Sequence, residues 1–402
     1  MATTAGLTAE VAIVGAGAAG LTASLALAGA GRETVWVAKP ALPDNRTTAL
    51  LAGSVTALET LGVWPALADR AAPLRILRIV DDTRRLLRAP EARFEAGEIG
   101  LSAFGHNIEN QHLLAALQAR AAELPALHHF EGEVEAIDID ENRVTLRLKS
   151  GHCITARLVI GADGSRSLCR AAAGIDTVGW RYPQSALTFN IGHTRLHDFI
   201  STEFHTESGP FTLVPLPGAR SSVVCVADTA EIERLRALDD AILAPNAEQR
   251  SHSILGKINV EHGRGVFPLA IETARSFGRN RIALIGDAAH RLPPIGAQGL
   301  NLGLRDAATI AELVAQARGG DPGGGELLAR YDRLRRVDVT SRNVAVDLLN
   351  RTLLSGFLPV QGARGFGFYL LNRIGPLRRA VMREGVSPIT SQPRLMRGEA
   401  LI

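Results

Sequence analysis

Short apolar runs that end at glycine occur three times along the chain, and each is followed by a stretch with helical spacing. The runs are residues 10–14, Leu158–Ile160 and Ile282–Ile285, and each has the length and β-branched content of a buried strand. The stretch from Leu300 to Ala317 has few helix breakers and an apolar face at helical period. Strands that alternate with helices in this way predict an α/β domain with a parallel sheet.

A different pattern fills residues 180–275, where segments of alternating apolar and polar residues are separated by turns. This block predicts an antiparallel sheet with one covering helix. The expected fold class is therefore α/β, a Rossmann-like dinucleotide-binding domain with an inserted antiparallel β-sheet domain and C-terminal helices. We divide the chain into a discontinuous nucleotide-binding domain (1–179 and 276–318), a substrate-binding sheet (180–275) and a C-terminal helical region (319–402).

The first strand leads into a Gly-x-Gly-x-x-Gly turn before an alanine-rich helix. Gly15 permits the tight turn, Gly17 lets a pyrophosphate approach the backbone, and Gly20 lets helix and strand pack closely. This arrangement predicts dinucleotide binding. The acid that usually follows the second strand and holds the adenosine ribose is missing, because Ala38 and Lys39 stand there. Backbone groups, water or the Lys39 ammonium would then hold the ribose.

Two acids stand at strand ends, Asp163 in Gly-Ala-Asp-Gly and Asp287 in Gly-Asp-Ala-Ala-His. Ligands of open α/β sheets bind at the carboxyl ends of the strands, so both acids can accept hydrogen bonds from sugar-like hydroxyls. A glycine-lined helix start follows Asp287, and it presents unpaired N–H groups and the positive end of the helix dipole. A ligand with polyol hydroxyls and a ring that becomes anionic suits this arrangement, and reduced flavin is such a ligand. The alternative is a strand–loop–helix crossover without a ligand.

The roles of several other polar residues are predicted from the sequence around them. Arg46, in a polar loop, can reach a pyrophosphate or a nicotinamide nucleotide, or it is a solvated loop arginine. Asn110 is expected to cap the next helix, so that Gln111 projects at its first turn. Residues 74–88 predict a strand pair with a solvated charged turn that includes Asp81. Three histidines in the sheet block fit no compact metal site, and we expect them at the surface or in a wall: His193, His197 and His205.

Composition narrows the function. Apolar residues make up 46% of the 402 residues, which is ample for a core, and 44 basic against 41 acidic residues give no electrostatic case for nucleic acid. The three cysteines are far apart in the sequence, so neither a disulfide framework nor a metal site is expected and a reducing cytosol fits. No signal-peptide pattern opens the chain and no apolar run approaches the roughly 20 residues of a membrane span. We expect a cytoplasmic protein, soluble or peripheral on the inner face of the membrane.

With these motifs in view, the chain resembles the aromatic-ring flavin monooxygenases with a para-hydroxybenzoate hydroxylase-like fold, most closely the ubiquinone-biosynthesis hydroxylase family. The resemblance covers nearly the whole length and includes GAGAAG at 15–20, GADGSRS at 161–167, GDAAH at 286–290, PIGAQGLNLGLRD at 294–306 and the closing PRLMRGEAL. Two positions depart from the pattern. Ala38 stands where many members keep an acid, and Ala297 stands where many have glycine, a change between small residues that we expect to matter little.

The resemblance implies FAD as cofactor and NAD(P)H or a redox partner protein as electron donor. It implies oxygen transfer from a flavin C4a-hydroperoxide to an apolar aromatic ring, that of a polyprenylated phenol or quinone precursor, with O2 as co-substrate. Pro294 would line the reacting side of the ring, and no protein nucleophile is expected. The cofactor-binding residues that we expect are Gly15, Gly17, Ala18, Ala19, Gly20, Lys39, Arg46, Gln111, Val134, Asp163, Gly286, Asp287, Gly296, Gly299, Leu300 and Asn301.

Three further hypotheses stay open at this stage. An FAD-dependent reductase of the same fold would not hydroxylate its substrate, and a flavin-binding subunit could organise a quinone-biosynthesis complex without turnover. The tail from Val344 to Glu384 interleaves apolar residues with arginines, which suggests amphipathic helices that contact an anionic membrane or pack onto the protein itself.

Overall fold

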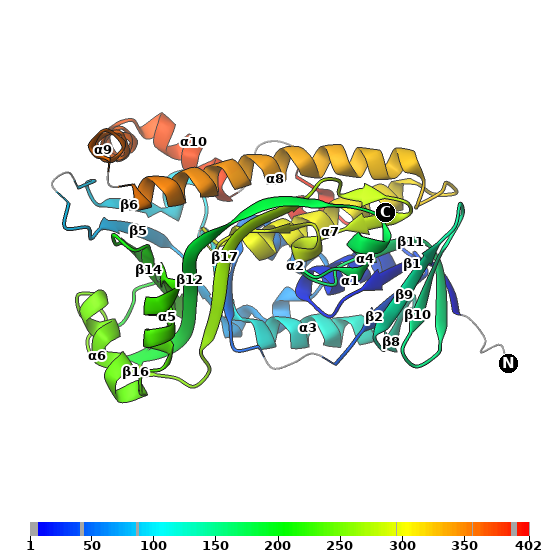
Figure 1. The fold of residues 1–402 in the computed structure, drawn as a ribbon, viewed down its shortest axis with the longest axis horizontal. Coiled ribbons are helices and arrows are strands. Elements are labelled where there is room, and N and C mark those ends of the chain that lie inside the picture. Colours follow the sequence, from blue (N-terminus) through cyan, green and yellow to red (C-terminus); the bar gives the residue numbers. More distant parts are fainter. Residues whose placement is uncertain are drawn as a thin grey trace.

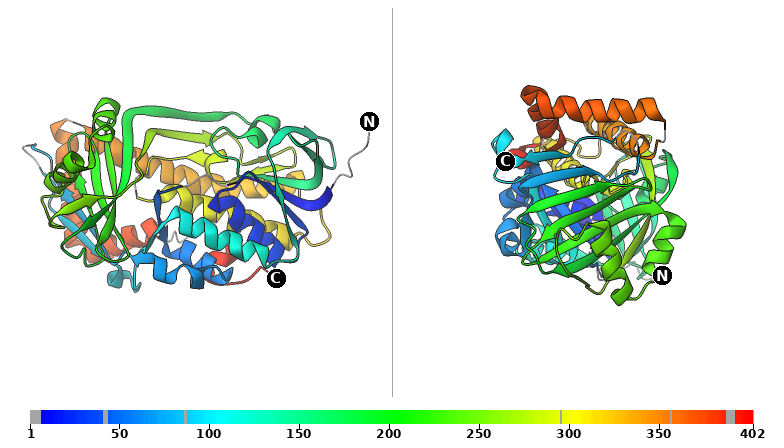
Figure 2. Two further views of the ribbon diagram at one scale, coloured as in Figure 1. Left: turned by 90° about the horizontal axis from the view of Figure 1, so that it is seen from below. Right: turned by 90° about the vertical axis from the view of Figure 1, so that its left-hand side faces the viewer.

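The computed structural model describes residues 7–40, 44–85, 88–294, 296–355, 357–386 and 392–401. Within these residues three sheets and ten α-helices form the layers seen in Figures 1 and 2. The helices are α1 (Ala18–Gly29), α2 (Ala52–Thr60), α3 (Asn110–Ala122), α4 (Leu168–Ala172), α5 (Thr229–Arg236), α6 (Asp240–Arg250), α7 (Gln298–Gln316), α8 (Gly325–Leu354), α9 (Leu358–Arg373) and α10 (Gly375–Val386).

The first sheet carries the parallel strands that the sequence predicted. Its central order is β19-β11-β1-β2-β8, all parallel, with β18 at one edge and the β9–β10 hairpin attached to β11. Its strands are β1 (Leu7–Val14), β2 (Thr34–Ala38), β8 (Leu127–Glu131), β9 (Val134–Ile139), β10 (Val144–Leu148), β11 (Cys153–Gly161), β18 (Gly278–Arg279) and β19 (Ile282–Leu284).

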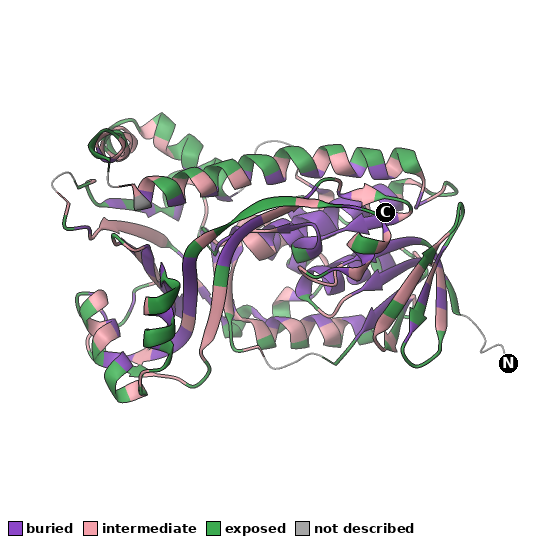
Figure 3. Cartoon of the chain, viewed as in Figure 1, coloured by how far each residue is buried: buried purple, intermediate pink, exposed green. Residues whose placement is uncertain are grey.

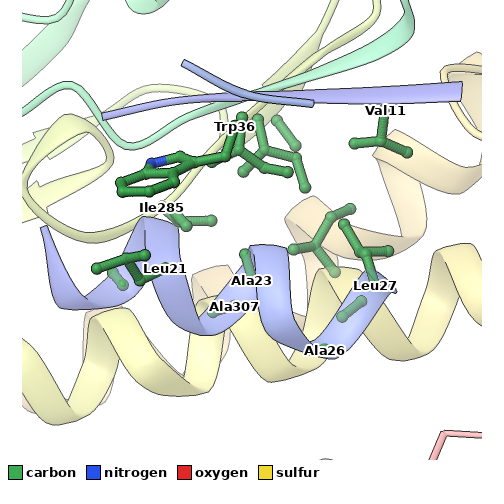
Figure 4. Packing of buried hydrophobic residues seen from close by; sticks show 14 of the residues in the cluster. Val11, Leu21, Ala23, Ala26, Leu27, Trp36, Ile285 and Ala307 are labelled. Carbon is green, nitrogen blue, oxygen red and sulfur yellow. The ribbon is translucent and has the colours of Figure 1, made fainter. Parts of the chain in front are cut away.

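One face of this sheet is covered by α1, and α7 packs on the far side of α1 (Figure 4). Helix α1 is buried on nearly every side, as expected for a helix of alanine and leucine with no polar face. Val11 and Trp36 from the strands meet Leu21 and Leu27 of α1 in one core cluster, which Ala307 of α7 joins. The cluster fixes where α1 and α7 begin relative to the strand ends.

The second sheet is antiparallel over most of its width and has the order β20-β17-β12-β15-β14-β13-β5-β6, with β16 beside β12. The long strands β12 and β17 run from beside the first sheet into the second (Figure 1). Its strands are β5 (Ile76–Asp81), β6 (Ala92–Glu95), β12 (Thr177–His193), β13 (Ile200–His205), β14 (Pro210–Leu216), β15 (Arg220–Asp228), β16 (Ile258–Val260), β17 (Gly265–Ala274) and β20 (His290–Arg291).

Three strands of this sheet, β5, β6 and β20, come from outside the 180–275 block. β5 pairs in parallel with β13, and β6 pairs with β5 in antiparallel register. The prediction of a solvated turn at Asp81 is wrong, because its carboxylate is almost fully buried in an ion pair with Arg364 of α9. Residues 86–87 of that stretch lie outside the described residues. The division into domains stays a prediction.

The remaining elements join the two sheets. A small sheet of β3 (Thr47–Leu51), β7 (Gly105–Glu109) and β4 (Ala71–Pro73) lies beside α2. Helix α8 runs along much of the length of the molecule and shows an exposed outer face (Figure 3). The 3-10 helices are η1 (Trp64–Ala66), η2 (Ala68–Arg70), η3 (Ala96–Ile99), η4 (Gly286–Ala288) and η5 (Arg394–Arg397), and η5 packs against α2. Among the helices of the described residues none is long and apolar enough to cross a membrane.

Candidate functional site

Three turns leave the first sheet side by side at one edge. Val14 of β1 pairs with Gly161 of β11, and Gly161 pairs with Leu284 of β19, so the three parallel strands end at the same level. The turns that follow carry Gly15, Asp163 and Asp287. Contact between the first two is close, because a Cβ built on Gly15 would lie 2.1 Å from the carbonyl oxygen of Ala162. Gly15 also has a φ of +136°, which favours glycine.

No side chain caps the start of α1. Gly17 is the N-cap residue and makes no side-chain cap, and no acid stands in the first turn. The N–H groups of Ala18, Ala19 and Gly20 therefore lack helical partners at the positive end of the helix dipole. A Cβ built on Gly17 would meet nothing within 4 Å, so free space lies in front of these donors. The arrangement suits a phosphate group.

A tryptophan that the sequence analysis did not single out supports this turn. The indole Nε1 of Trp36 donates a hydrogen bond of 2.8 Å to the carbonyl oxygen of Gly15, and its ring stacks on His129 with centroids 4.1 Å apart. Because Trp36 is almost fully buried on β2, it ties the glycine turn to the neighbouring strand. A Trp inside an apolar strand gave no signal beyond core packing.

At the end of β2 the residue Lys39 is paired rather than free. Its ammonium lies 2.8 Å from Glu133, which also contacts Lys149 at 2.9 Å. Val134, the first residue of β9, lies next to this cluster and is half-buried. The acid missing at Ala38 is not replaced on β2, although Glu131 of β8 lies directly opposite Ala38 in the register.

Arg46 connects the glycine-turn edge with the second sheet. Its guanidinium makes two hydrogen bonds of 2.7 Å to Asp44 and lies 5.2 Å from the ring centroid of Phe267 on β17. The hydrogen bonds to Asp44 raise the pKa of Arg46, and the negative charge of Asp287 adds to the effect. Arg46 and Asp287 therefore lie near each other, as a shared ligand would require.

The start of α3 differs in detail from the expectation. Glu109 precedes the helix, Asn110 is its first residue, and no side chain caps it. The side chain of Asn110 instead donates to Asp44 at 2.9 Å and accepts a hydrogen bond from Thr48 at 2.6 Å. The capping role predicted for Asn110 is therefore wrong, because its amide holds the Arg46 loop. Gln111 stands exposed in the first turn, as predicted.

The two strand-end acids have different surroundings. The Asp163 carboxylate accepts hydrogen bonds from the Ser167 hydroxyl at 2.6 Å and from the Cys169 N–H at 3.0 Å, so it holds the start of α4. Burial, together with the charge of Asp163, raises the pKa of the Cys169 thiol well above its usual value. Asp287 is exposed and has no hydrogen bond or ion pair to any described residue. Its carboxylate is the available acceptor at this edge.

A buried carboxylate that the sequence analysis did not assign holds the Asp287 turn in place. Asp306 of α7, fully inaccessible, accepts hydrogen bonds from the Gly286 N–H at 3.0 Å, His290 Nε2 at 2.6 Å and Arg335 Nε at 2.6 Å. Burial alone would raise the pKa of Asp306, but the charges of His290 and Arg335 lower it to about 2. An acid on the buried face of an amphipathic helix was the available signal, since such charges need partners.

The start of α7 also lies at the edge of the first sheet where Asp287 stands. Ala297 is its N-cap residue, no acid stands in the first turn, and the N–H groups of Gln298, Gly299 and Leu300 lack helical partners. Pro294 and Gly296 are exposed beside it, and Ile295 lies outside the described residues. A second helix start without a capping side chain therefore belongs to the helix that packs against the Asp287 turn.

Two residues of this segment act differently from the expectation. Ala297 has a φ of 54°, in the left-handed region where a Cβ costs about 1–2 kcal/mol. The change from glycine is thus not neutral, because strain is stored at the helix start. The side chain of Asn301 is fully used inside the protein: it accepts from Leu51 N–H and Ser54 and donates to the carbonyls of Ala49 and Ala297. Asn301 therefore clamps α2 and β3 to α7.

The three histidines of the second sheet lie in its interior. His193 contacts Ser221 at 3.0 Å, His197 contacts the carbonyl of Leu216 at 2.9 Å, and His205 contacts Glu203 at 2.6 Å. All three are buried, so a surface position is wrong and a wall position fits. Among the described residues no three His, Cys, Asp or Glu side chains are grouped as metal ligands.

An open depression of about 750 Å³ lies at the opposite, amino-terminal ends of β1 and β11. Four arginines line it, and three of them, Arg32, Arg157 and Arg281, contact an acid. Arg32 pairs with Glu10 at 2.7 Å, while Arg281 and Arg157 both contact Asp321, at 2.7 and 3.5 Å. Because three of these four cations contact neighbouring acids, the depression competes poorly with the strand-end edge for an anionic nucleotide.

The strand-end edge fits FAD. Gly17 leaves open space before the α1 donors, Asp287 leaves a free carboxylate for hydroxyls, and the start of α7, which no side chain caps, suits a ring that gains negative charge. A family model described as the FAD binding domain matches residues 8–345. The chain belongs to this FAD-binding family. FAD is therefore its cofactor, as the motifs predicted.

Individual relatives agree with this assignment. The chain is 34% identical over 365 residues to the ubiquinone hydroxylase UbiL of Rhodospirillum rubrum, across 89% of this chain and 84% of that protein. It is 32% identical to the 3-demethoxyubiquinol 3-hydroxylase of Escherichia coli, across 85% and 87% of the two chains. These relatives confirm the resemblance to ubiquinone-biosynthesis hydroxylases.

A solved structure confirms the predicted fold class. The p-nitrophenol 4-monooxygenase PnpA from Pseudomonas putida superimposes with a TM-score of 0.77 at 20% identity, over 96% of this chain and 100% of that one. The FAD-binding family fold thus extends across the described residues, including the second sheet.

Two glycine substitutions separate folding from cofactor binding. Gly15→Ala places a methyl group 2.1 Å from the Ala162 oxygen at a left-handed φ, and we expect the free energy of unfolding to fall by about 2 kcal/mol or more. Gly17→Ala meets no atom, so the fold should hold while FAD affinity falls roughly tenfold or more, because the methyl group occupies the phosphate's space. Urea unfolding of the apoprotein and FAD titration measure both. Equal FAD affinity in Gly17→Ala would contradict the site.

The Asp306 interaction predicts a pH dependence. The folded pKa of about 2 lies below the ordinary 3.8, so the stabilisation is fully present above about pH 4 and is lost as the pH falls towards 2. Its size is roughly 2 kcal/mol by linkage. Asp306→Asn should be less stable at pH 7 by about 3–5 kcal/mol, since Arg335 loses its buried partner, and should lose less stability between pH 4 and pH 2.

Urea midpoints at pH 7, 4 and 3 test this expectation. Asp69→Asn is the matched control, because Asp69 is exposed and its loss should leave the pH profile of the wild type. An Asp306→Asn protein whose stability follows the wild-type pH profile would show that the buried carboxylate does not stabilise the fold as described.

Proposed function

We propose that this protein is an FAD-dependent monooxygenase that hydroxylates the aromatic ring of a polyprenylated phenol or quinone precursor in ubiquinone biosynthesis. The observation that carries the proposal lies at one edge of the first sheet. There the starts of α1 and α7, which no side chain caps, come together with the free carboxylate of Asp287. The names of the relatives, ubiquinone hydroxylase and demethoxyubiquinol hydroxylase, support the substrate class.

In this proposal the ends of the cofactor are held by different elements. The α1 start, with Gly15 to Gly20, binds the pyrophosphate, and Arg46 lies close enough to assist it. Lys39 and Val134 are assigned to the adenosine end of the cofactor, and Gln111, Asp163 and Asp287 to its ribityl chain. The segment from Pro294 to Asn301, with Gly296, Gly299 and Leu300, is placed at the flavin ring.

The protein stabilises negative charge on the reduced flavin and excludes water from the reacting ring. Bound FAD, once reduced, activates O2 and supplies the oxygen atom that is transferred to the ring. The N–H groups at the α7 start stabilise negative charge that develops on the reduced ring, because the dipole and the unpaired donors point there. The second sheet, backed by α5 and α6, shields the reacting ring from water.

The electron donor is assigned by chemistry alone. NAD(P)H is the expected reductant, and a redox partner protein is the alternative, because among the described residues we see one glycine-rich phosphate turn after a strand. A reductase of the same fold would consume NAD(P)H without adding oxygen to the phenol. A non-catalytic subunit of a quinone-biosynthesis complex would bind FAD without either reaction.

Product analysis distinguishes these functions. We expect the FAD-loaded protein with NADPH and O2 to convert a short polyprenylated phenol into a product that carries one added oxygen atom from ¹⁸O2, measured by mass spectrometry.

Asp287→Ala should retain the fold but lose most bound FAD, since the free acceptor at the strand end is gone. Reduction of FAD without ¹⁸O in the product would contradict hydroxylation, and full FAD occupancy in Asp287→Ala would contradict the assigned role.

We also propose that α9 and α10 contact an anionic membrane surface, where a polyprenylated substrate would reside. Phe366 and Tyr369 on α9 and Leu377 and Val381 on α10 are large apolar residues that are exposed. Exposed arginines accompany them, as in helices that lie in the membrane interface: Arg373, Arg379 and Arg383.

Vesicle co-sedimentation tests this contact. We expect the protein to sediment with phosphatidylglycerol-containing vesicles, less so at high salt, and the double variant Phe366→Ser/Leu377→Ser to bind roughly tenfold more weakly or worse. Ile242→Ser is the control, because Ile242 is exposed but lies on α6, which covers the second sheet and is not part of the proposed membrane surface. Equal sedimentation of the double variant and the wild type would rule out this surface.

A further inference from the structure

The second sheet has two chemically different faces. One face is apolar and packs under α5 and α6, with Phe204, Phe211 and Val223 at its centre. Neighbouring residues along each strand point the opposite way. On that opposite face the strand register places a row of partly accessible side chains on neighbouring strands: Glu203 on β13, Thr212 on β14, Val224 on β15 and Thr188 on β12.

The one acid in this row is held in a defined orientation. Glu203 Oε1 lies 2.6 Å from His205 Nε2, and the Thr212 hydroxyl donates to Oε2 at 3.4 Å. The His205 side chain is 2% exposed, while Glu203 keeps 21% of its side chain accessible. Each carboxylate oxygen can accept more than one hydrogen bond. Glu203 is therefore anchored from one side by a buried histidine and open on the other.

Contacts through β5 and α10 link the neighbourhood of Glu203 to the α7 start. Ile79 of β5 lies directly beside Glu203 in the register and belongs to a cluster with Met382 and Val386 of α10. The same end of α10 touches the α7 start, because Gln298 Nε2 contacts the Gly385 carbonyl at 3.5 Å. Glu203 is thus on the wall next to the segment that we assign to the flavin ring.

The Glu203 neighbours explain why an acid is tolerated here. The row around it is otherwise neutral, with hydroxyl and aliphatic side chains, and Asp81, which is paired with Arg364, lies opposite His205, two register pairs further along β5. A carboxylate on such a wall has no arginine or lysine to neutralise it among the described residues, and its recorded partners are His205 and Thr212. A ligand that donates a hydrogen bond would complete its coordination.

We propose that Glu203 accepts a hydrogen bond from the hydroxyl group of the phenolic substrate and so selects free phenols over their ethers. This inference rests on the function proposed above. The contact orients the ring at the wall, and it draws the hydroxyl proton towards the carboxylate, which makes the ring richer in electrons for oxygen transfer. His205 is a positioning residue, because it is buried and holds the Glu203 carboxylate.

A site built around such an acceptor rejects a ligand that lacks the donor. Hydrogen bonds to charged groups are stronger than neutral ones, and a methyl ether in the same place would leave the carboxylate unpaired and desolvated. Apolar contacts of the ring and prenyl chain are the same for both compounds. The pair of a phenol and its methyl ether therefore isolates the Glu203 contact.

The test measures ligand binding to the oxidised FAD-loaded protein by the change in flavin absorbance, with 2-geranylphenol and its methyl ether as probes. In the wild type we expect the phenol to bind about tenfold more tightly than the ether or better. In Glu203→Gln the phenol should weaken about tenfold to a hundredfold, while the ether binds as well as before or better, because the amide can donate to the ether oxygen. Glu233→Gln on the exposed face of α5 should match the wild type.

The outcomes separate this inference from the proposed function. A wild type that binds neither compound and forms no hydroxylated product overturns the function and the inference with it. A wild type that hydroxylates the phenol, with a Glu203→Gln variant that keeps the wild-type preference or loses both ligands equally, overturns the inference alone. If Glu203→Gln does not retain FAD, Glu203→Asp decides: the retracted carboxylate should weaken phenol binding only, and unchanged phenol binding overturns the inference.

Discussion

The Asp306 carboxylate determines how the candidate site is assembled. Transfer of an isolated carboxylate into a protein interior is very unfavourable, so the charge can exist there only with donors around it. Gly286, His290 and Arg335 supply these donors from the end of β19, from β20 and from α8, while Asp306 itself lies on α7. One side chain therefore ties α7 and α8 to the turn that presents Asp287. Any movement of α7 away from the sheet would leave a buried charge uncompensated.

The position of α7, which Asp306 fixes, also determines where the other parts of the site lie. Gly303, one turn before Asp306, packs so closely that a Cβ there would lie 3.1 Å from the Cα of Gly286 and 3.4 Å from Ala19. The starts of α1 and α7 are therefore held on either side of one strand end, and no side chain caps either of them. Such positive helix ends suit a phosphate group and a ring that gains negative charge. The second sheet adds the wall on which Glu203 stands.

The sequence predicted the parts of this arrangement that depend on local pattern. The glycine turn, the strand-end acids and the helix after Gly299 follow from short-range periodicity and from the backbone freedom of glycine. The sequence did not place β5 and β6 in the second sheet, because a parallel pair such as β5 and β13 joins residues more than a hundred positions apart. It also could not show that Asp163 holds α4, that the Asn301 side chain bonds to α2, β3 and the Ala297 carbonyl, or that Asp81 is buried by Arg364. These are contacts between distant segments, and no spacing rule encodes them.

The most direct test of the central claim is a crystal structure of the protein grown with FAD. The account predicts that the pyrophosphate lies at the N–H groups of Ala18 to Gly20, that the ribityl chain passes Asp287, and that the flavin ring lies before the start of α7. The competing location is the depression at the amino-terminal ends of β1 and β11, lined by Arg32, Arg157 and Arg281. A nucleotide found there, with the strand-end edge filled by solvent, would contradict the account.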